Sequence, residues 1–268
     1  EVEAALAAEP GVGQAAVVAA DTDVPGVKRL IGYIVPDGQA RPGAAEEQLT
    51  EWRQIYDDEY TQVGTAVHVE EFAGWTSSYD GRPIPLEHMR EWRDATVARI
   101  RALQPRRILE IGCGTGLLLS KLAPEAESYW ATDFAGPVIA KLHKDVDPSW
   151  PVTLRCQAAH DFTGLPEGFF DTIVINSVAQ YFPTADYLAD VITRSLDLLV
   201  PGGRLFLGDI RDLRTLRAFH AAIQLGRGGG DLPAIDRAVR MEKELLLDPA
   251  FFTSLNLPAR VEIRTKRG

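Results

Sequence analysis

Five short apolar runs alternate with helical stretches through the middle of the chain. The runs lie near residues 107–111, 128–132, 152–156, 171–176 and 203–208, and helical runs fill the segments between them. This alternation predicts a parallel sheet with helices on both faces, because each parallel crossover needs a connection of helix length. In such sheets ligands bind beyond the carboxyl ends of the strands. The pattern therefore predicts an α/β fold whose site lies at that edge.

The segments on either side of this core have different patterns. Residues 49–104 are mostly helical and place Trp52, Tyr56 and Tyr60 on one face, which by default is core. A polar, turn-rich loop at 75–85 interrupts the helices and carries two aromatic residues, so it could cover a pocket. After residue 210 the chain is predicted to be helical through about 247, with a flexible glycine break at 226–230. Residues 260–265 are predicted as one further strand.

The first 38 residues form a separate small piece. A helix through residue 8 precedes two β-rich runs at 14–20 and 29–35, with a polar loop at 21–26 between them. A piece of this size cannot bury a sufficient core alone and must pack on something. Residues 39–48 are rich in Gly, Pro, Ala and Gln and are predicted to be a linker.

Three alternating glycines directly follow the first central strand. Gly112, Gly114 and Gly116 read G-x-G-x-G, whereas the nicotinamide fingerprint G-x-G-x-x-G needs a glycine where this chain has Leu117. Glycines in such a turn admit positive φ angles and let a ligand lie against bare main chain. The spacing indicates a nucleotide-type cofactor and disfavours a nicotinamide oxidoreductase.

An acidic residue, Asp133, ends the second strand at βαβ distance from the glycines. Its carboxylate can accept both hydroxyls of an adenosine ribose. The alternative is a cap for the helix predicted at 135–142. The pairing with the glycine turn favours the ribose role.

These residues resemble class I methyltransferases that use S-adenosylmethionine. Motifs at 72–81 (FAGWTSSYDG), 176–183 (NSVAQYFP), 208–211 (GDIR) and 244–249 (ELLLDP) narrow the resemblance to N-methyltransferase domains embedded in nonribosomal peptide synthetases, over residues 49–268. The resemblance implies a Rossmann-like core at 105–268 with a helical insertion at 211–250, behind a helical lid region at 49–104. That family ends its sheet with an antiparallel hairpin, of which this sequence holds only the first arm.

Residues 1–38 resemble part of the C-terminal subdomain of a synthetase adenylation domain. The alternative is an extension that belongs to the methyltransferase itself. In this family an insert after the subdomain's second strand accompanies methylation of the α-amine. The order of the pieces therefore implies α-amine rather than side-chain methylation.

The resemblance implies S-adenosyl-L-methionine as cofactor and assigns residues to its parts. The methionine portion lies against the three glycines near Glu110, the ribose on Asp133, the adenine beside Asp161 and Phe162, and the ammonium near Asn176 and Ser177. An ordinary turn is the alternative for Asp161. Cys113 is expected to be a small residue tolerated in the turn, not a nucleophile.

Candidates on the substrate side come from the strand ends and the helical insertion. The residues expected to orient an amine are Glu244, His220, Asp209 and Tyr181, and the expected substrate or lid contacts are Tyr79, Gln180 and Glu242. The alternatives are a packing role for Tyr181, a hydrogen-bonded core role for His220 and a solvated face for the glutamates. No spaced set of His, Cys and Asp resembles a metal site.

Composition narrows the partners. A net charge of -10 and a pI near 5.0 argue against nucleic acid, which needs clustered Lys and Arg. Two cysteines cannot form a disulfide framework, and no apolar run has the length of a membrane span, so we expect a cytoplasmic protein without a membrane partner. The sequence begins without Met or a signal peptide and is expected to be part of a larger polypeptide.

We therefore expect methyl transfer from S-adenosylmethionine to the α-amine of an aminoacyl thioester on the phosphopantetheine arm of a carrier domain. The expected partners are that carrier domain, the remainder of the adenylation domain and a small accessory protein. A cofactor-binding scaffold without activity is an alternative. A free small-molecule methyltransferase is disfavoured by the adenylation-like residues 1–38.

Overall fold

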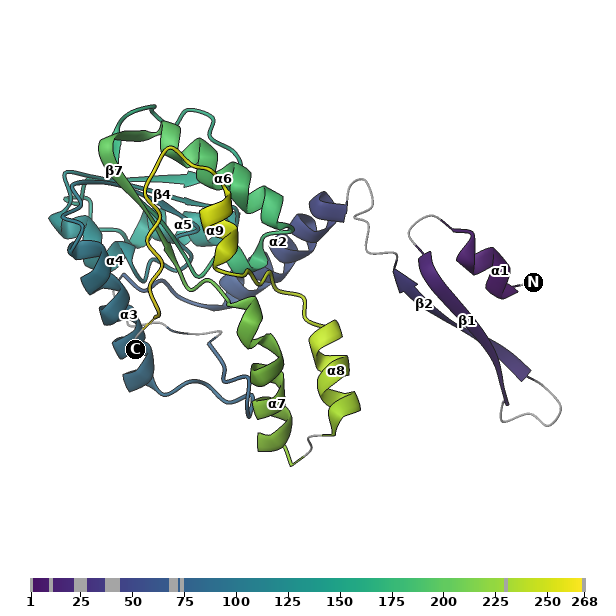
Figure 1. Cartoon of the computed structure of the whole chain (residues 1–268). Helices are drawn as coiled ribbons and strands as arrows, with labels where there is room; N and C mark the ends of the chain where they lie inside the picture. The colour runs from purple at the N-terminus through teal and green to yellow at the C-terminus, as the bar shows by residue number, and fades with distance from the viewer. Residues whose placement is uncertain are drawn as a thin grey trace. The chain divides into compact units, whose positions relative to one another are not determined.

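The structure is a computed structural model that describes residues 2–9, 12–21, 28–36, 44–67, 72, 75–228 and 231–266 (Figure 1). It divides into two compact units, Glu1–Gln48 and Leu49–Gly268. Most of the predicted loop at 21–26 and the linker residues 39–43 lie outside the described residues, as does part of the motif at 72–81. No helix of the described residues is long and apolar enough to cross a membrane.

The first unit is a hairpin with one short helix against it. Helix α1 (Val2–Ala7) precedes strands β1 (Val12–Asp21) and β2 (Lys28–Pro36), which pair antiparallel. Glu3 of α1 accepts a hydrogen bond from the Val17 amide of β1 at 2.8 Å. The predicted helix and two strands are confirmed.

The second unit contains a five-stranded parallel sheet. Its strands, in the order β5-β4-β3-β6-β7, are β3 (Arg107–Ile111), β4 (Ser128–Asp133), β5 (Val152–Cys156), β6 (Phe170–Asn176) and β7 (Leu199–Gly208). The central strands β3 and β6 are buried along almost their whole length, which explains why isoleucine, leucine and valine predominate at their centres. The predicted α/β fold with a parallel sheet is confirmed.

Helices cover both faces of this sheet. One core packs α3 (Leu86–Arg101), α4 (Leu119–Leu122) and α5 (Gly136–Asp145) against one face. The other core packs α6 (Ala185–Asp197) and α9 (Ala250–Ser254) against the opposite face. Helix α6 supplies Leu188, Val191 and Ile192, which repeat at helical spacing and are buried.

Among the described residues of this unit, three further helices flank the layered core, and one of them packs Tyr56 and Tyr60 against it. Helix α2 (Ala44–Gln62) begins inside the predicted linker, so positions 44–48 are helical rather than irregular. Helices α7 (Leu216–Gly226) and α8 (Leu232–Arg240) form an antiparallel pair that extends from the sheet (Figure 1).

Two secondary-structure predictions after residue 210 were wrong. The predicted helix through 247 ends at Arg240, because the following segment joins other main chain: the Leu245 amide donates to the Gln180 carbonyl at 2.7 Å and the Leu247 amide to that of Arg211 at 3.0 Å. Residues 260–265 are not a strand. A strand needs a neighbour for its amides and carbonyls, and no described strand pairs with this segment.

Candidate functional site

The glycine turn is fixed to the next strand by main-chain hydrogen bonds. The amides of Gly112 and Cys113 both donate to the Thr132 carbonyl, at 2.8 and 3.0 Å. Gly112 has φ +78°, and a Cβ built there would lie 2.3 Å from Cγ2 of Val178. Position 112 therefore excludes any side chain, both for its backbone angle and for lack of space.

Asp133 binds the main chain of the glycine turn through its carboxylate. It is buried, and its two carboxylate oxygens accept hydrogen bonds from the amides of Gly114 and Ala135, each at 2.9 Å. Burial raises the pKa of Asp133 to about 6, although these amide donors oppose the rise; the charge of Asp57 adds to it. The helix-cap alternative does not describe these contacts, because the N-cap of α5 is Ala135. Each oxygen keeps a lone pair for a further donor.

An aromatic face of α2 lies over this edge. Tyr56 meets Phe134 and Tyr181 edge to face, with ring centroids 6.0 and 5.2 Å apart, and Trp52 lies 4.7 Å from Tyr181. The hydroxyl of Tyr60 lies 3.1 Å from the position that a Cβ of Gly114 would take. The aromatic stripe predicted as core thus covers the glycine turn, and Tyr181 is held within it.

The carboxyl-terminal end of α2 is bound by a side chain of α5. The ammonium of Lys141, on α5, donates to three carbonyls there, those of Tyr60, Thr61 and Val63. A lysine at the carboxyl end of a helix satisfies free carbonyls and complements the helix dipole. This cap fixes the aromatic face to the element that follows Asp133.

Glu110 lies below the glycine turn and inside the core. Its carboxyl group is 3% exposed and accepts a hydrogen bond from the Tyr129 hydroxyl at 2.6 Å. Burial raises its pKa to about 8; the Tyr129 hydroxyl opposes the rise and the charge of Asp133 adds to it. Burial likewise raises the pKa of Cys113 well above its usual value, so the thiol stays protonated, in line with the expectation that it is not a nucleophile.

Asp161 and Phe162 follow β5 on the surface of the unit. Asp161 is exposed and accepts from the Thr163 amide at 2.9 Å; this donor lowers the pKa of the Asp161 carboxyl. Its carbonyl accepts from the Gln157 side chain at 2.6 Å. The ring of Phe162 lies under the Arg194 guanidinium, 4.5 Å from it. These contacts match the turn alternative, and the adenine role of both residues stays a prediction.

The ends of β6 and β7 are joined through side chains. The Asn176 amide donates to the Ser177 hydroxyl at 3.0 Å, and that hydroxyl donates to Asp209. Asp209 also accepts from the Trp92 indole at 2.8 Å and pairs with Lys266. Ser177 and Asp209 both have positive φ, +59° and +57°, which places sharp turns at this edge.

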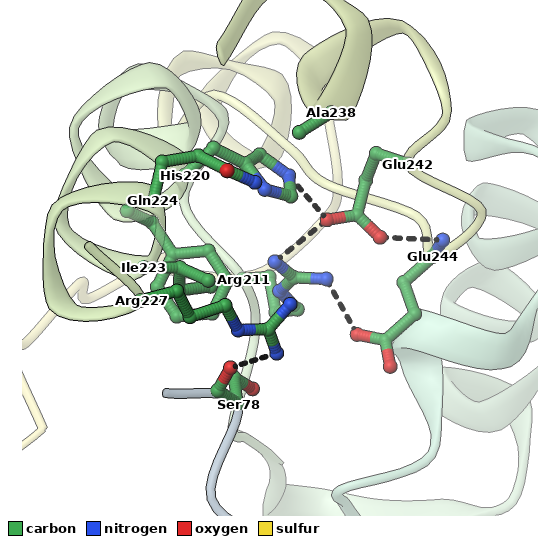
Figure 2. A pocket seen from close by; sticks show the side chains of 10 residues that line it. Ser78, Arg211, His220, Ile223, Gln224, Arg227, Ala238, Glu242 and Glu244 are labelled. Atoms are coloured by element: carbon green, nitrogen blue, oxygen red, sulfur yellow. Dashed lines mark hydrogen bonds and ion pairs between the residues drawn. The ribbon is translucent and has the colours of Figure 1, made fainter. Parts of the chain in front are cut away.

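A cavity of about 510 Å³ opens beside this edge (Figure 2). Arg211 lies at its centre and donates to Glu242 at 3.0 Å and to Glu244 at 2.7 Å. His220 reaches the same Glu242 oxygen through Nε2 at 3.2 Å. Burial raises the pKa of Glu242, but the donors Arg211, the Glu244 amide and His220 outweigh it and hold that pKa below its usual value. Glu242 is therefore held in its charged form, and both glutamates pair with one arginine.

The polar loop at 75–85 reaches the cavity through α7. Arg227, just after α7, donates to the Ser78 carbonyl at 2.9 Å (Figure 2) and to the Tyr79 carbonyl at 3.3 Å. The ring of Tyr79 meets Phe219 of α7 at 6.3 Å and is half exposed. The loop thus contributes Ser78 to the lining of the cavity, and its role as a cover stays a prediction.

Only part of the predicted substrate group is brought together. The structure joins His220, Glu242 and Glu244 in the cavity, while Tyr79 does not line it and Asp209 and Tyr181 are engaged elsewhere. Sequence reasoning missed Arg211, although it ends the quoted motif at 208–211. It also missed Asp57, a charged residue beside the aromatic stripe of α2.

The glycine turn and the cavity share one edge of the sheet. Neighbouring strands lie about 4.8 Å apart, so the ends of β3 and β7, two strands apart, are separated by about 10 Å. The segment that carries Glu244 also bonds directly to Gln180, after β6. A ligand on the turn and a second ligand in the cavity could therefore meet.

Residues 109–207, which include the glycine turn and β4 to β6, match the family described as "Methyltransferase domain". The chain carries an S-adenosylmethionine-dependent methyltransferase domain. Residues 1–72 match "AMP-binding enzyme C-terminal domain", and this match extends beyond the predicted 1–38 into α2, which was expected to belong to a methyltransferase lid region.

Relatives of the methyltransferase domain and its N-terminal unit are large synthetases. The whole chain is 47% identical to the probable non-canonical nonribosomal peptide synthetase CymA of Salinispora arenicola (strain CNS-205) and 42% identical to chondramide synthase cmdD of Chondromyces crocatus. It spans only 4% and 7% of their lengths. Among solved structures, the N-methyltransferase NodS of Bradyrhizobium japonicum WM9 with S-adenosyl-L-homocysteine is 20% identical, over 70% of this chain and 84% of that one, with a TM-score of 0.47.

Three buried oxygens test whether this edge fits the methyltransferase cofactor. Oδ1 of Asp57, Oε1 of Gln157 and Oε1 of Gln180 have no hydrogen-bond partner among the described residues. Buried acceptors normally have one. Asp57 lies on α2, and the two glutamines follow β5 and β6, so all three are near the strand ends. S-adenosylmethionine has an ammonium, two ribose hydroxyls and an exocyclic amine, and such donors fit this set.

Proposed function

We propose that the methyltransferase domain methylates the α-amine of an aminoacyl residue held as a thioester on the phosphopantetheine arm of a carrier domain, during nonribosomal peptide synthesis. The observation that carries the proposal is the group of His220, Glu242, Arg211 and Glu244 in a cavity at the cofactor edge. The match of residues 1–72 to an adenylating enzyme's C-terminal domain and the synthetase relatives support the carrier-bound substrate. On this proposal the remainder of the adenylation domain and a small accessory protein are further partners.

The cofactor would be held mainly by main chain and by Asp133. Gly112 and Gly114 add no side chains to the turn, where Val178 and the Tyr60 hydroxyl already lie close to the backbone, and the free lone pairs of Asp133 suit two ribose hydroxyls. The aromatic face of α2 excludes water from above. When bound, S-adenosylmethionine supplies an electrophilic methyl group on a sulfonium. Alignment of amine and methyl, not acid–base chemistry, then supplies most of the rate.

His220 is the residue that we assign to the amine's proton. An α-ammonium titrates near 8 and must lose a proton before its lone pair can attack. The glutamates are poor acceptors because Arg211 already holds both. Glu242 bonds Nε2 of His220, which favours the tautomer with its proton on Nε2 and a lone pair on Nδ1. Glu242 and Arg211 act as positioning residues for that imidazole.

The test is mass spectrometry of a carrier domain, loaded with an aminoacyl group, after incubation with the full chain and S-adenosylmethionine. We expect the mass of one methylene to be added, and fragmentation to locate it on the α-amine. Substitution H220N should lower the rate by about 10²-fold or more, with cofactor affinity unchanged. Methylation of a side chain, or cofactor binding without transfer, would contradict the proposal, and the second result would favour the scaffold alternative.

A further inference from the structure

The helical pair α7 and α8 carries exposed positive charge on an acidic chain. Arg237 and Arg240 lie on the face of α8 opposite the buried Ile235, and neither pairs with a carboxylate anywhere in the described residues. Arg227 bonds only to carbonyls, so its charge is also uncompensated. The whole chain has a net charge of -10. A local basic surface on such a chain favours an anionic partner.

The same helical pair exposes two large apolar side chains at its tip. Leu225, near the end of α7, is 66% exposed, and Leu232, at the start of α8, is 65% exposed. Single exposed leucines are common, but two of them on a helical pair that also carries unpaired arginines have the composition of an interaction site, which combines apolar and charged side chains. We call Leu225, Arg227, Leu232, Arg237 and Arg240 the hairpin face.

The hairpin face borders the mouth of the cavity. Arg227 and Ala238 both line the cavity, and Arg237 directly precedes Ala238 on α8 (Figure 2). In Figure 1 the two helices extend from the sheet, so a large partner can reach them. A substrate delivered over this face enters beside His220 and Glu242.

We propose that the hairpin face docks the carrier domain. Its arginines meet an anionic surface of the carrier and the phosphodiester that joins the carrier to its phosphopantetheine arm. Leu225 and Leu232 are covered in the complex. Charge complementarity selects this partner. The arm is anionic where it leaves the carrier, Arg227 lines the cavity that the far end of the arm must enter, and Arg237 adjoins the lining residue Ala238. This inference rests on the proposed function and names the surface that serves it.

The experiment compares two substrates of the full chain: an aminoacyl carrier domain and the same aminoacyl group on free pantetheine. Substitution R237E should raise KM for the carrier-bound substrate by about five- to tenfold, more steeply at low salt, and leave free pantetheine thioester unaffected, because rim charges act mainly on association. Substitution K144E is the matched control, since Lys144 is an exposed cation on α5 without a described partner. It should change neither substrate.

Equal losses on both substrates, or no loss on the carrier, would overturn the docking proposal. Carrier binding is measured separately by fluorescence anisotropy, with a phosphopantetheinylated carrier domain as the probe. If the wild-type chain methylates no carrier-bound substrate, the proposed function is wrong. Weaker carrier binding by R237E than by K144E would still support the hairpin face as the docking surface. Equal binding by both variants would contradict it.

Discussion

Glu110 provides a sharp test of the electrostatics beneath the glycine turn. Burial raises its pKa from an ordinary 4.5 to about 8, so near neutral pH the folded chain keeps a proton on this carboxyl that the unfolded chain releases. Below pH 4.5 the carboxyl is protonated in both the folded and the unfolded chain. As pH rises from 4.5 to 8, only the unfolded chain releases the proton, so the free energy of unfolding falls. Substitution E110Q removes the titration while keeping an acceptor for the Tyr129 hydroxyl.

The size of the effect follows from the shift. Each pKa unit corresponds to about 1.36 kcal/mol, so Glu110 costs about 3 kcal/mol of stability at pH 7 and about 5 kcal/mol above pH 8, relative to pH 4.5. We expect E110Q to match wild type near pH 4.5 and to exceed it by about 3 kcal/mol at pH 7. Substitution Y129F should steepen the wild-type loss, because the Tyr129 hydroxyl stabilises the charged form.

The measurement is urea unfolding followed by tryptophan fluorescence between pH 4.5 and 8. All five tryptophans lie after residue 48, so the signal reports only the methyltransferase unit. Substitution E91Q, at an exposed glutamate of α3, controls for the loss of one carboxyl. Equal pH profiles for wild type and E110Q, or a less stable E110Q at pH 7, would refute burial as the cause of the raised pKa.

Three further predictions concern the site. Wild-type affinity for S-adenosylmethionine, measured by calorimetry, should weaken as pH falls through about 6, where Asp133 takes up a proton; D133N should bind about tenfold less tightly or worse, without that pH dependence. In thermal unfolding, G112A should cost about 2–3 kcal/mol or more from strain and the clash with Val178, whereas G81A, with similar φ and open space, should cost about 1 kcal/mol. R211A should lower methyl transfer by tenfold or more and R211K by less, since a lysine keeps the charge but not the two-pronged contact.

Sequence predicted the sheet well because its central strands are buried on both faces. The runs at 107–111 and 171–176 place apolar residues side by side, at 108–109 and 173–175, rather than at every second position, as a parallel strand covered on both faces requires. The prediction of a strand at 260–265 was wrong because this segment has no neighbouring strand in the described residues. Its residues favour strand, but strand formation depends on a neighbour, which composition does not report.

Periodicity also identified the aromatic face of α2 without saying what it covers. Trp52, Tyr56 and Tyr60 recur every fourth residue, and that spacing is the same for a helix in the core and for one over a site. The partners that decide between the two, Phe134 and Tyr181, are more than seventy residues away. Tertiary contact at this range is not encoded in a local pattern.

The two halves of the site differ in how directly sequence specifies them. The cofactor half is built at strand ends, where the order of strands and helices fixes the position of Gly112 and Asp133. The acceptor half depends on ion pairs from Arg211 to residues 31 and 33 positions later, across two helices. Nothing local pairs an arginine with a distant glutamate, so only the residue types could be predicted. A helical insertion whose contacts are set at this range can change without disturbing the sheet, and it is therefore the part of the domain in which acceptor specificity can vary while the cofactor site stays constant.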